Sequence, residues 1–205
     1  MCPFKIRNVS LLFFFISVAM VHAQVSRPHK VQVLQSTITI HGSTNINQFS
    51  CKLVQDNPGE KWQVTRHFHS GLLTFDNLQL RYSVAEFDCG IKAMNSDFQE
   101  LLQAKTHPQL QFTIQSIEVQ DMGSTMERVK VATKVIIKIA GQRKETLIEN
   151  SHVLNYSDVQ MELTGSQDFL ITDFNLEPPT KMFGMVKVRD SINIQYQIHL
   201  LALPM

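Results

Sequence analysis

Apolar and polar residues alternate along most of the chain, a pattern that predicts β-strands with one buried face. The alternation is most regular over residues 129–139, where Val, Thr or Ile occupies every second position. Residues 62–69 alternate less clearly, and we interpret them as an edge strand or a long connection. The other predicted strands lie within residues 30–40, 45–54, 72–75, 78–84, 110–114, 144–156, 159–164 and 184–200. About eight such strands with short connections predict a mainly β fold, either an antiparallel closed barrel or a sandwich.

One short helix interrupts the strands. Phe98 and Leu102 belong to an apolar stripe at helical spacing, which predicts an amphipathic helix over residues 96–105. Ser96 is the expected N-cap. Pro108 is expected to end the helix, because the residue before a proline is disfavoured in the helical conformation. A single amphipathic helix among strands is expected to cover an open end or edge of the sheet.

The first 23 residues have the pattern of a secretory signal peptide. Lys5 and Arg7 form a basic start, residues 11–21 are a predominantly apolar run, and Ala23 precedes the expected cleavage site. The run is shorter than the roughly 20 residues that a transmembrane helix needs, and no later stretch is longer. We therefore expect export to the periplasm or another extracytoplasmic compartment. The mature chain, residues 24–205, is expected to form one domain without a transmembrane segment.

The charge of the mature chain excludes one class of partner. Without Lys5 and Arg7, 17 basic residues remain against 18 acidic ones, which leaves a net charge of −1. No basic patch or run of arginines is present to hold phosphates, so nucleic acid is not an expected partner.

Two cysteines remain after the leader, Cys51 and Cys89, each in a Phe-x-Cys triplet. An oxidising compartment favours a disulfide between them. In a simple meander, however, their strands are separated by a third strand and stand about 10 Å apart, whereas a disulfide needs Cα atoms within about 7 Å. The sequence leaves open whether the two cysteines are bonded or are buried thiols.

The sequence carries none of the common catalytic or phosphate-binding motifs: it has no GxSxG, HExxH or CxxC and no glycine-rich phosphate loop. His67 and His69 have a spacing that can bind metal on one side of a strand, but no third ligand can be named. We therefore predict no catalytic residue and no metal site, and we do not expect an enzyme.

Large apolar and aromatic residues occupy the positions expected to face the barrel interior. A barrel of eight strands either packs its own side chains or holds one narrow ligand, and the sequence leaves both open. The candidate lining residues are Phe49, Phe75, Leu80, Tyr82, Phe112, Ile114, Val135, Ile137, Ile139, Phe169, Phe183, Ile192, Ile194 and Tyr196.

Short motifs follow one another in a characteristic order: GSTNINQF at residues 42–49, AMNSDF at 93–98, HPQLQF at 107–112, IAGQRK at 139–144, and a closing segment at 169–179 and 184–190. In order and spacing these motifs resemble the YceI-like family over residues 30–200. The resemblance implies an exported, antiparallel, eight-stranded lipocalin-like β-barrel with one short capping α-helix, which binds polyisoprenoid or other long-chain lipids.

The resulting hypothesis is a periplasmic binding protein that holds a long-chain isoprenoid or fatty-acyl lipid in the barrel and needs no other cofactor. The alternative is a non-enzymatic envelope stress or structural module with a self-filled barrel that acts through its surface. The sequence leaves a homodimer open in either case.

Overall fold

The computed structural model describes residues 28–56, 61–67, 71–121, 128–155, 157 and 159–203. The expected leader and its cleavage site lie outside these residues. The elements are β1 (Pro28–Ser43), β2 (Gln48–Asp56), β3 (Lys61–His67), β4 (Leu72–Ser83), η1 (Val84–Glu86), α1 (Lys92–Leu101), β5 (Gln109–Asp121), β6 (Arg128–Ile139), β7 (Gln142–Asn155), β8 (Gln160–Leu170), η2 (Ile171–Phe174), β9 (Thr180–Lys181), β10 (Val186–Lys187) and β11 (Ser191–Leu203).

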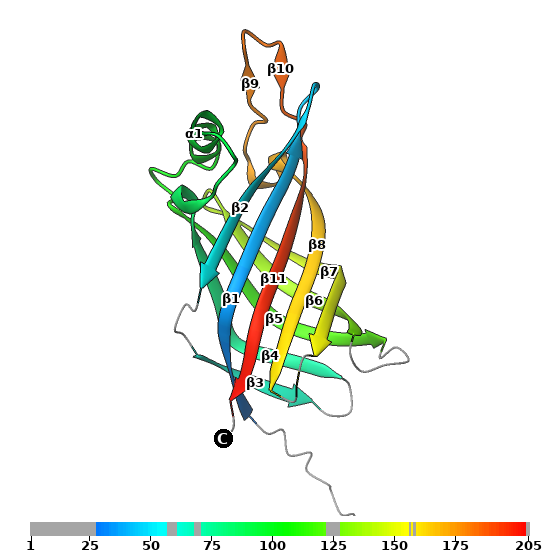
Figure 1. Ribbon diagram of the computed structural model, residues 1–205. Helices are drawn as coiled ribbons and strands as arrows, with labels where there is room; N and C mark the ends of the chain where they lie inside the picture. Colours follow the sequence, from blue (N-terminus) through cyan, green and yellow to red (C-terminus); the bar gives the residue numbers. More distant parts are fainter. Residues whose placement is uncertain are drawn as a thin grey trace, which may run out of the picture.

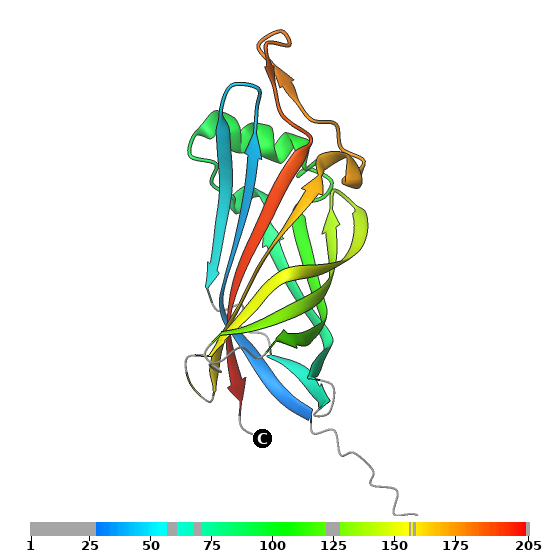
Figure 2. The ribbon, with the colours of Figure 1, turned by 90° about the vertical axis from the view of Figure 1, so that its right-hand side faces the viewer.

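The sheet curls round and closes on β1 (Figures 1 and 2). The strand order is β11-β8-β7-β6-β5-β4-β3-β1-β2, and β11 also pairs with β1 along most of its length. Every pairing is antiparallel. The prediction of a mainly β, antiparallel barrel is therefore confirmed, although the sheet has nine strands instead of eight.

The ninth strand arises because two strands share one edge of β1. β3 pairs with Pro28–Gln32 and β2 pairs with Gln35–Ser43. β3 also pairs with β4, so the segment interpreted as an edge strand or a connection is an interior strand of the sheet. β2 takes the edge position instead. Bulges such as those between Thr74 and Leu78 and between Ile114 and Ser116 allow the sheet to bend strongly.

The core lies inside the curled sheet and is made by the alternate apolar positions. The inward residues of β1 face those of its neighbours, as in the pairs Ile38 with Tyr196 and Ile40 with Cys51. On the opposite wall, Phe112 of β5 stands between Leu80 of β4 and Ile137 of β6. Period-two burial thus follows the alternation in the sequence.

The helix begins and ends earlier than predicted. α1 starts at Lys92, so Ser96 lies in its middle and is not the N-cap. It ends at Leu101 and not at Pro108, because Gln103 adopts a positive φ of 54° and turns the chain first. The predicted apolar stripe does face the core: Phe98 and Leu102 are buried, and the Phe98 ring lies 5.2 Å from that of Phe87. The helix lies towards the end of the barrel opposite the C-terminus (Figure 1).

Candidate functional site

The structure places most of the candidate lining residues on the inner face of the sheet. Phe49 and Ile192 are partly buried and pack against the core. Phe183 does not line the barrel: it is fully exposed on the turn between β9 and β10. The prediction that Phe183 lines the barrel rested on its apolar side chain and is wrong, because the chain has left the barrel wall for the β9–β10 hairpin before it reaches this residue. The buried candidates are Phe75, Leu80, Tyr82, Phe112, Ile114, Val135, Ile137, Ile139, Phe169, Ile194 and Tyr196.

One interior hydroxyl is well satisfied. Tyr196 OH lies 2.8 Å from Ser151 Oγ, and Ser151 also donates to the Ile148 carbonyl at 3.0 Å. The ring of Tyr196 covers Gly165 so closely that a Cβ at that position would clash with it. Burial raises the pKa of Tyr196, and the hydrogen bond with Ser151 opposes the shift. This tyrosine therefore has a clear structural role.

A second interior tyrosine has no such partner. Tyr82 is completely buried, and its ring meets that of Phe112 edge to face at 5.8 Å. Burial raises its pKa strongly, so the hydroxyl is protonated throughout the physiological range. The nearby Ser36 hydroxyl opposes this shift, yet neither hydroxyl makes a hydrogen bond of standard geometry among the described residues.

Five buried side-chain polar atoms have no hydrogen-bond partner in the described residues, and three of them lie together on the barrel wall. The other two, Gln115 Oε1 on β5 and Thr133 Oγ1 on β6, lie elsewhere. Ser36 of β1 stands opposite Gln55 of β2, and both side chains face inward. The Gln55 amide nitrogen donates to the Arg81 carbonyl, next to Tyr82 in β4, at 3.3 Å. Gln55 Oε1, Ser36 Oγ and Tyr82 OH are all buried without a partner in the described part of the chain. We call these three residues the seam cluster, since they lie where β2 faces β4. Buried polar groups are normally paired, so this cluster is unusual.

The wall between β2 and β4 is a seam and not a continuous ladder. In the described residues β3 pairs only with the Leu72–Phe75 part of β4, so residues 78–83 of β4 have strand pairing with β5 alone. The segment after η1 closes the seam: Lys52 and Asp88 exchange backbone hydrogen bonds of 2.8 and 2.9 Å.

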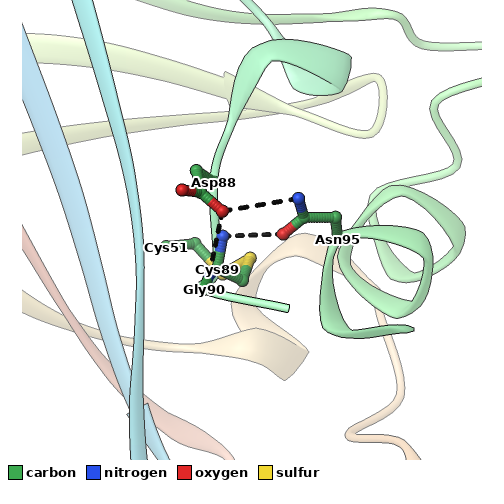
Figure 3. Close-up of a disulfide and its surroundings, with 5 residues drawn as sticks. All are labelled: Cys51, Asp88, Cys89, Gly90 and Asn95. Carbon is green, nitrogen blue, oxygen red and sulfur yellow. Dashed lines mark hydrogen bonds between the residues drawn. A yellow bond between two sulfur atoms is a disulfide. The ribbon is translucent and has the colours of Figure 1, made fainter. Parts of the chain in front are cut away.

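A disulfide holds the seam shut. Cys51 of β2 is bonded to Cys89, with the two Cα atoms 4.0 Å apart (Figure 3). The meander argument against this bond is wrong, because residues 87–90 leave β4 and return beside β2. The sulfur atoms are buried, with Cys51 only 2% exposed.

The start of α1 is anchored to the disulfide segment. Asn95 Oδ1 accepts a hydrogen bond from the Cys89 amide at 2.7 Å, and Asp88 Oδ1 accepts one from the Gly90 amide at 2.9 Å (Figure 3). The Asn95 amide group also reaches Asp88 at 3.5 Å. The disulfide, the seam and the start of the helix are therefore joined by one set of bonds.

Two polar grooves lie on the outer face of the sheet, which the sequence did not predict. One, of about 560 Å³, crosses β1, β2, β8 and β11 and includes His41 and Asp168. The other, of about 440 Å³, crosses β1, β7, β8 and β11, reaches Arg128 at the start of β6, and includes Asn150 and His152. Partial burial, together with nearby basic residues, lowers the pKa of His152. The hydroxyl, amide and imidazole groups that line the two grooves belong to the outward-facing, polar positions of the strands.

Among the residues that the structure describes, no group of three or more His, Cys, Asp or Glu side chains is placed to hold a metal. The side chains of the His67 and His69 pair lie outside those residues. In the same part of the chain, no helix combines the length and apolar character needed to cross a bilayer.

The comparisons with known proteins identify the fold. No protein-family model and no curated protein matches the sequence. A polyisoprenoid-binding domain from Saccharophagus degradans, implicated in plant cell wall breakdown, matches with a TM-score of 0.55 and 12% identity over 84% of this chain and 98% of the domain. BcnA of Burkholderia cenocepacia (TM-score 0.48, 17% identity, 80% and 95% covered) and a YceI protein of Campylobacter jejuni (TM-score 0.47, 13% identity, 97% and 98% covered) are further neighbours.

The chain therefore has the fold of this polyisoprenoid-binding domain. YceI proteins are among the other solved structures to which it is similar. At these identities the likeness concerns the fold.

Proposed function

We propose that the protein is an exported binding protein, not an enzyme, that holds a long-chain isoprenoid or fatty-acyl lipid inside the barrel. The observation that carries the proposal is the apolar interior of the closed sheet, into which the seam cluster projects hydroxyls that have no hydrogen-bond partner among the described residues. The fold is shared with a domain described as polyisoprenoid-binding, which supports the same ligand class.

Affinity would come from removing the tail from water, at about 0.8 kcal/mol for each buried CH₂ group. Such binding selects poorly for chain length, because every added methylene contributes a similar amount. Central side chains such as Leu78, Ile137 and Leu163 are 0% exposed, so an entering tail has to displace some of them. The disulfide and the Lys52–Asp88 pair close the seam at one end, whereas at Gln55 β2 has no strand pairing with β4 among the described residues, and we infer that the tail enters there.

The seam cluster would then meet the head of the ligand. Tyr82 and Ser36 offer hydroxyls that donate and accept, whereas Gln55 Oε1 only accepts. No buried Lys or Arg is found in the described core to balance an anion. A neutral oxygen-bearing head, such as a hydroxyl or a carbonyl, fits this set better than a phosphate or an ionised carboxylate.

Export is supported by two independent features. The first 23 residues have the pattern of a cleaved leader. The Cys51–Cys89 disulfide is a bond that persists in oxidising compartments such as the bacterial periplasm.

The test is native mass spectrometry of the protein recovered from a bacterial periplasm, followed by solvent extraction. We expect a stoichiometric extra mass that extracts as lipid. Ile137→Phe, which adds bulk to the interior, should carry much less lipid than the wild type. Lys138→Phe, the neighbouring outward position on β6, is the matched control and should carry the wild-type amount.

A bare mass that persists after incubation with isoprenoid alcohols, quinones and fatty acids would contradict the proposal. So would equal lipid loads on folded Ile137→Phe and Lys138→Phe proteins. Either result would favour the second candidate, a self-filled barrel that acts through its surface. That candidate is supported by the fully buried centre of the barrel and by the two polar grooves outside it.

A further inference from the structure

The hairpin formed by β9 and β10 carries a cluster of exposed apolar side chains at its tip. Phe183 is 108% exposed relative to a free residue, and Met182 and Met185 are each 64% exposed. Ile46, on the turn between β1 and β2, is 70% exposed. We call these four residues the apolar tip. The hairpin projects beyond the barrel, at the end opposite the C-terminus, in both views (Figures 1 and 2).

The two loops of the apolar tip are bound to each other. Asn45 donates from its side chain to the Met185 carbonyl at 2.9 Å and accepts from the Lys187 amide at 2.8 Å. The Asn45 amide also donates to the Lys187 carbonyl at 3.0 Å. Ile46 is therefore held beside the hairpin. The base of the hairpin is tied to α1 through a 2.8 Å ion pair between Lys181 and Asp97.

Unpaired positive charge accompanies the tip. Lys187 and Arg189 are exposed, and neither is in an ion pair with any residue that the structure describes. Lys181 is only partly exposed, and Asp97 balances its charge and raises its pKa. Two cations without an ion pair among the described residues therefore lie close to the tip in the chain, in β10 and just after it.

We propose that the apolar tip docks on the surface of an anionic bilayer. Phe183 and the two methionines enter the boundary between head groups and acyl chains, and Lys187 and Arg189 contact the lipid phosphates. Apolar side chains bordered by basic residues are the usual composition of interfacial membrane anchors. The tip is convex and projects from the body, so it suits a deformable bilayer better than a partner protein that would need a matching pocket. This inference does not depend on a lipid in the barrel.

The test is sedimentation of the protein, beginning at Gln24, with vesicles of phosphatidylcholine alone or mixed with phosphatidylglycerol. The wild type should bind the mixed vesicles and should bind less as the salt concentration rises. Phe183→Ser should weaken binding about tenfold or more. Leu147→Ser, which removes a 49% exposed apolar side chain from the outer face of β7, is the matched control and should leave binding unchanged.

Two further variants separate the apolar and electrostatic contributions. Replacement of both Lys187 and Arg189 by Gln should remove the preference for phosphatidylglycerol. In the Phe183→Trp variant, spin labels placed at a shallow depth in the bilayer should quench more tryptophan fluorescence than they do in the wild type, which contains only Trp62. This measurement reports membrane contact directly and does not require a variant that loses binding. The proposal is overturned if the wild type does not bind mixed vesicles, or if Phe183→Ser binds like Leu147→Ser. It is also overturned if Phe183→Ser changes only the oligomeric state, because the tip would then be a protein interface.

Discussion

The substitutions Tyr82→Phe and Tyr196→Phe, both in the barrel interior, should change the free energy of unfolding in opposite directions. Tyr82 OH is buried and makes no hydrogen bond of standard geometry among the described residues, a state that costs about 1–3 kcal/mol. Tyr82→Phe removes that cost, while the ring contact with Phe112 is kept, so we expect the free energy of unfolding to rise by about 1 kcal/mol. Tyr196→Phe loses the bond to Ser151 and should lower it by about 1 kcal/mol.

The two variants are well matched, because both tyrosines face the same core and each loses one oxygen atom. Urea denaturation of delipidated protein measures the difference, about 2 kcal/mol or roughly thirtyfold in the unfolding equilibrium. Bound lipid has to be removed first, since a ligand stabilises the folded state by mass action. If Tyr82→Phe is destabilised as much as Tyr196→Phe, the Tyr82 hydroxyl has a partner and the seam cluster is not an unsatisfied site. If the reasoning holds, the stabilised variant should also bind an isoprenoid alcohol more weakly.

Three further predictions concern other parts of the fold. Replacing Cys51 and Cys89 by Ala should lower the free energy of unfolding in urea by about 4 kcal/mol, the chain-entropy value for a 38-residue separation; a loss below about 1 kcal/mol would contradict this. Gly165→Ala should lower the thermal midpoint, at a cost of about 1–3 kcal/mol, because its Cβ meets a tyrosine ring; an unchanged midpoint would mean that the ring moves freely. The hydrogen bond from Lys144 holds the pKa of Asp173 below its ordinary 3.8, so this pair stabilises the fold above that pH and loses its effect as the pH falls further. Lys144→Gln should therefore show a smaller loss of stability in acid than the wild type, and an identical acid titration would exclude a role for the pair.

For the helix, the local sequence pattern predicts which side chains are buried but not where the helix begins. The apolar stripe of Phe98 and Leu102 is a property of neighbouring residues, and the structure buries both side chains. The start of the helix was predicted wrongly at Ser96, because its position depends on residues outside the stripe. Asn95 is engaged with the Cys89 amide, a contact that exists only once the segment before the helix lies beside β2.

The sequence by itself determined which residues of each strand face inward, because side chains alternate along any β-strand wherever the strand is placed. Val135 and Ile137 are buried for that reason. Only the tertiary structure decided what depends on the pairing of distant segments. It brought Cys89 beside Cys51, gathered Ser36 and Tyr82 at one seam, and carried Phe183 out of the barrel on a hairpin. Such contacts join residues far apart in the chain, so periodicity within a short window carries no information about them.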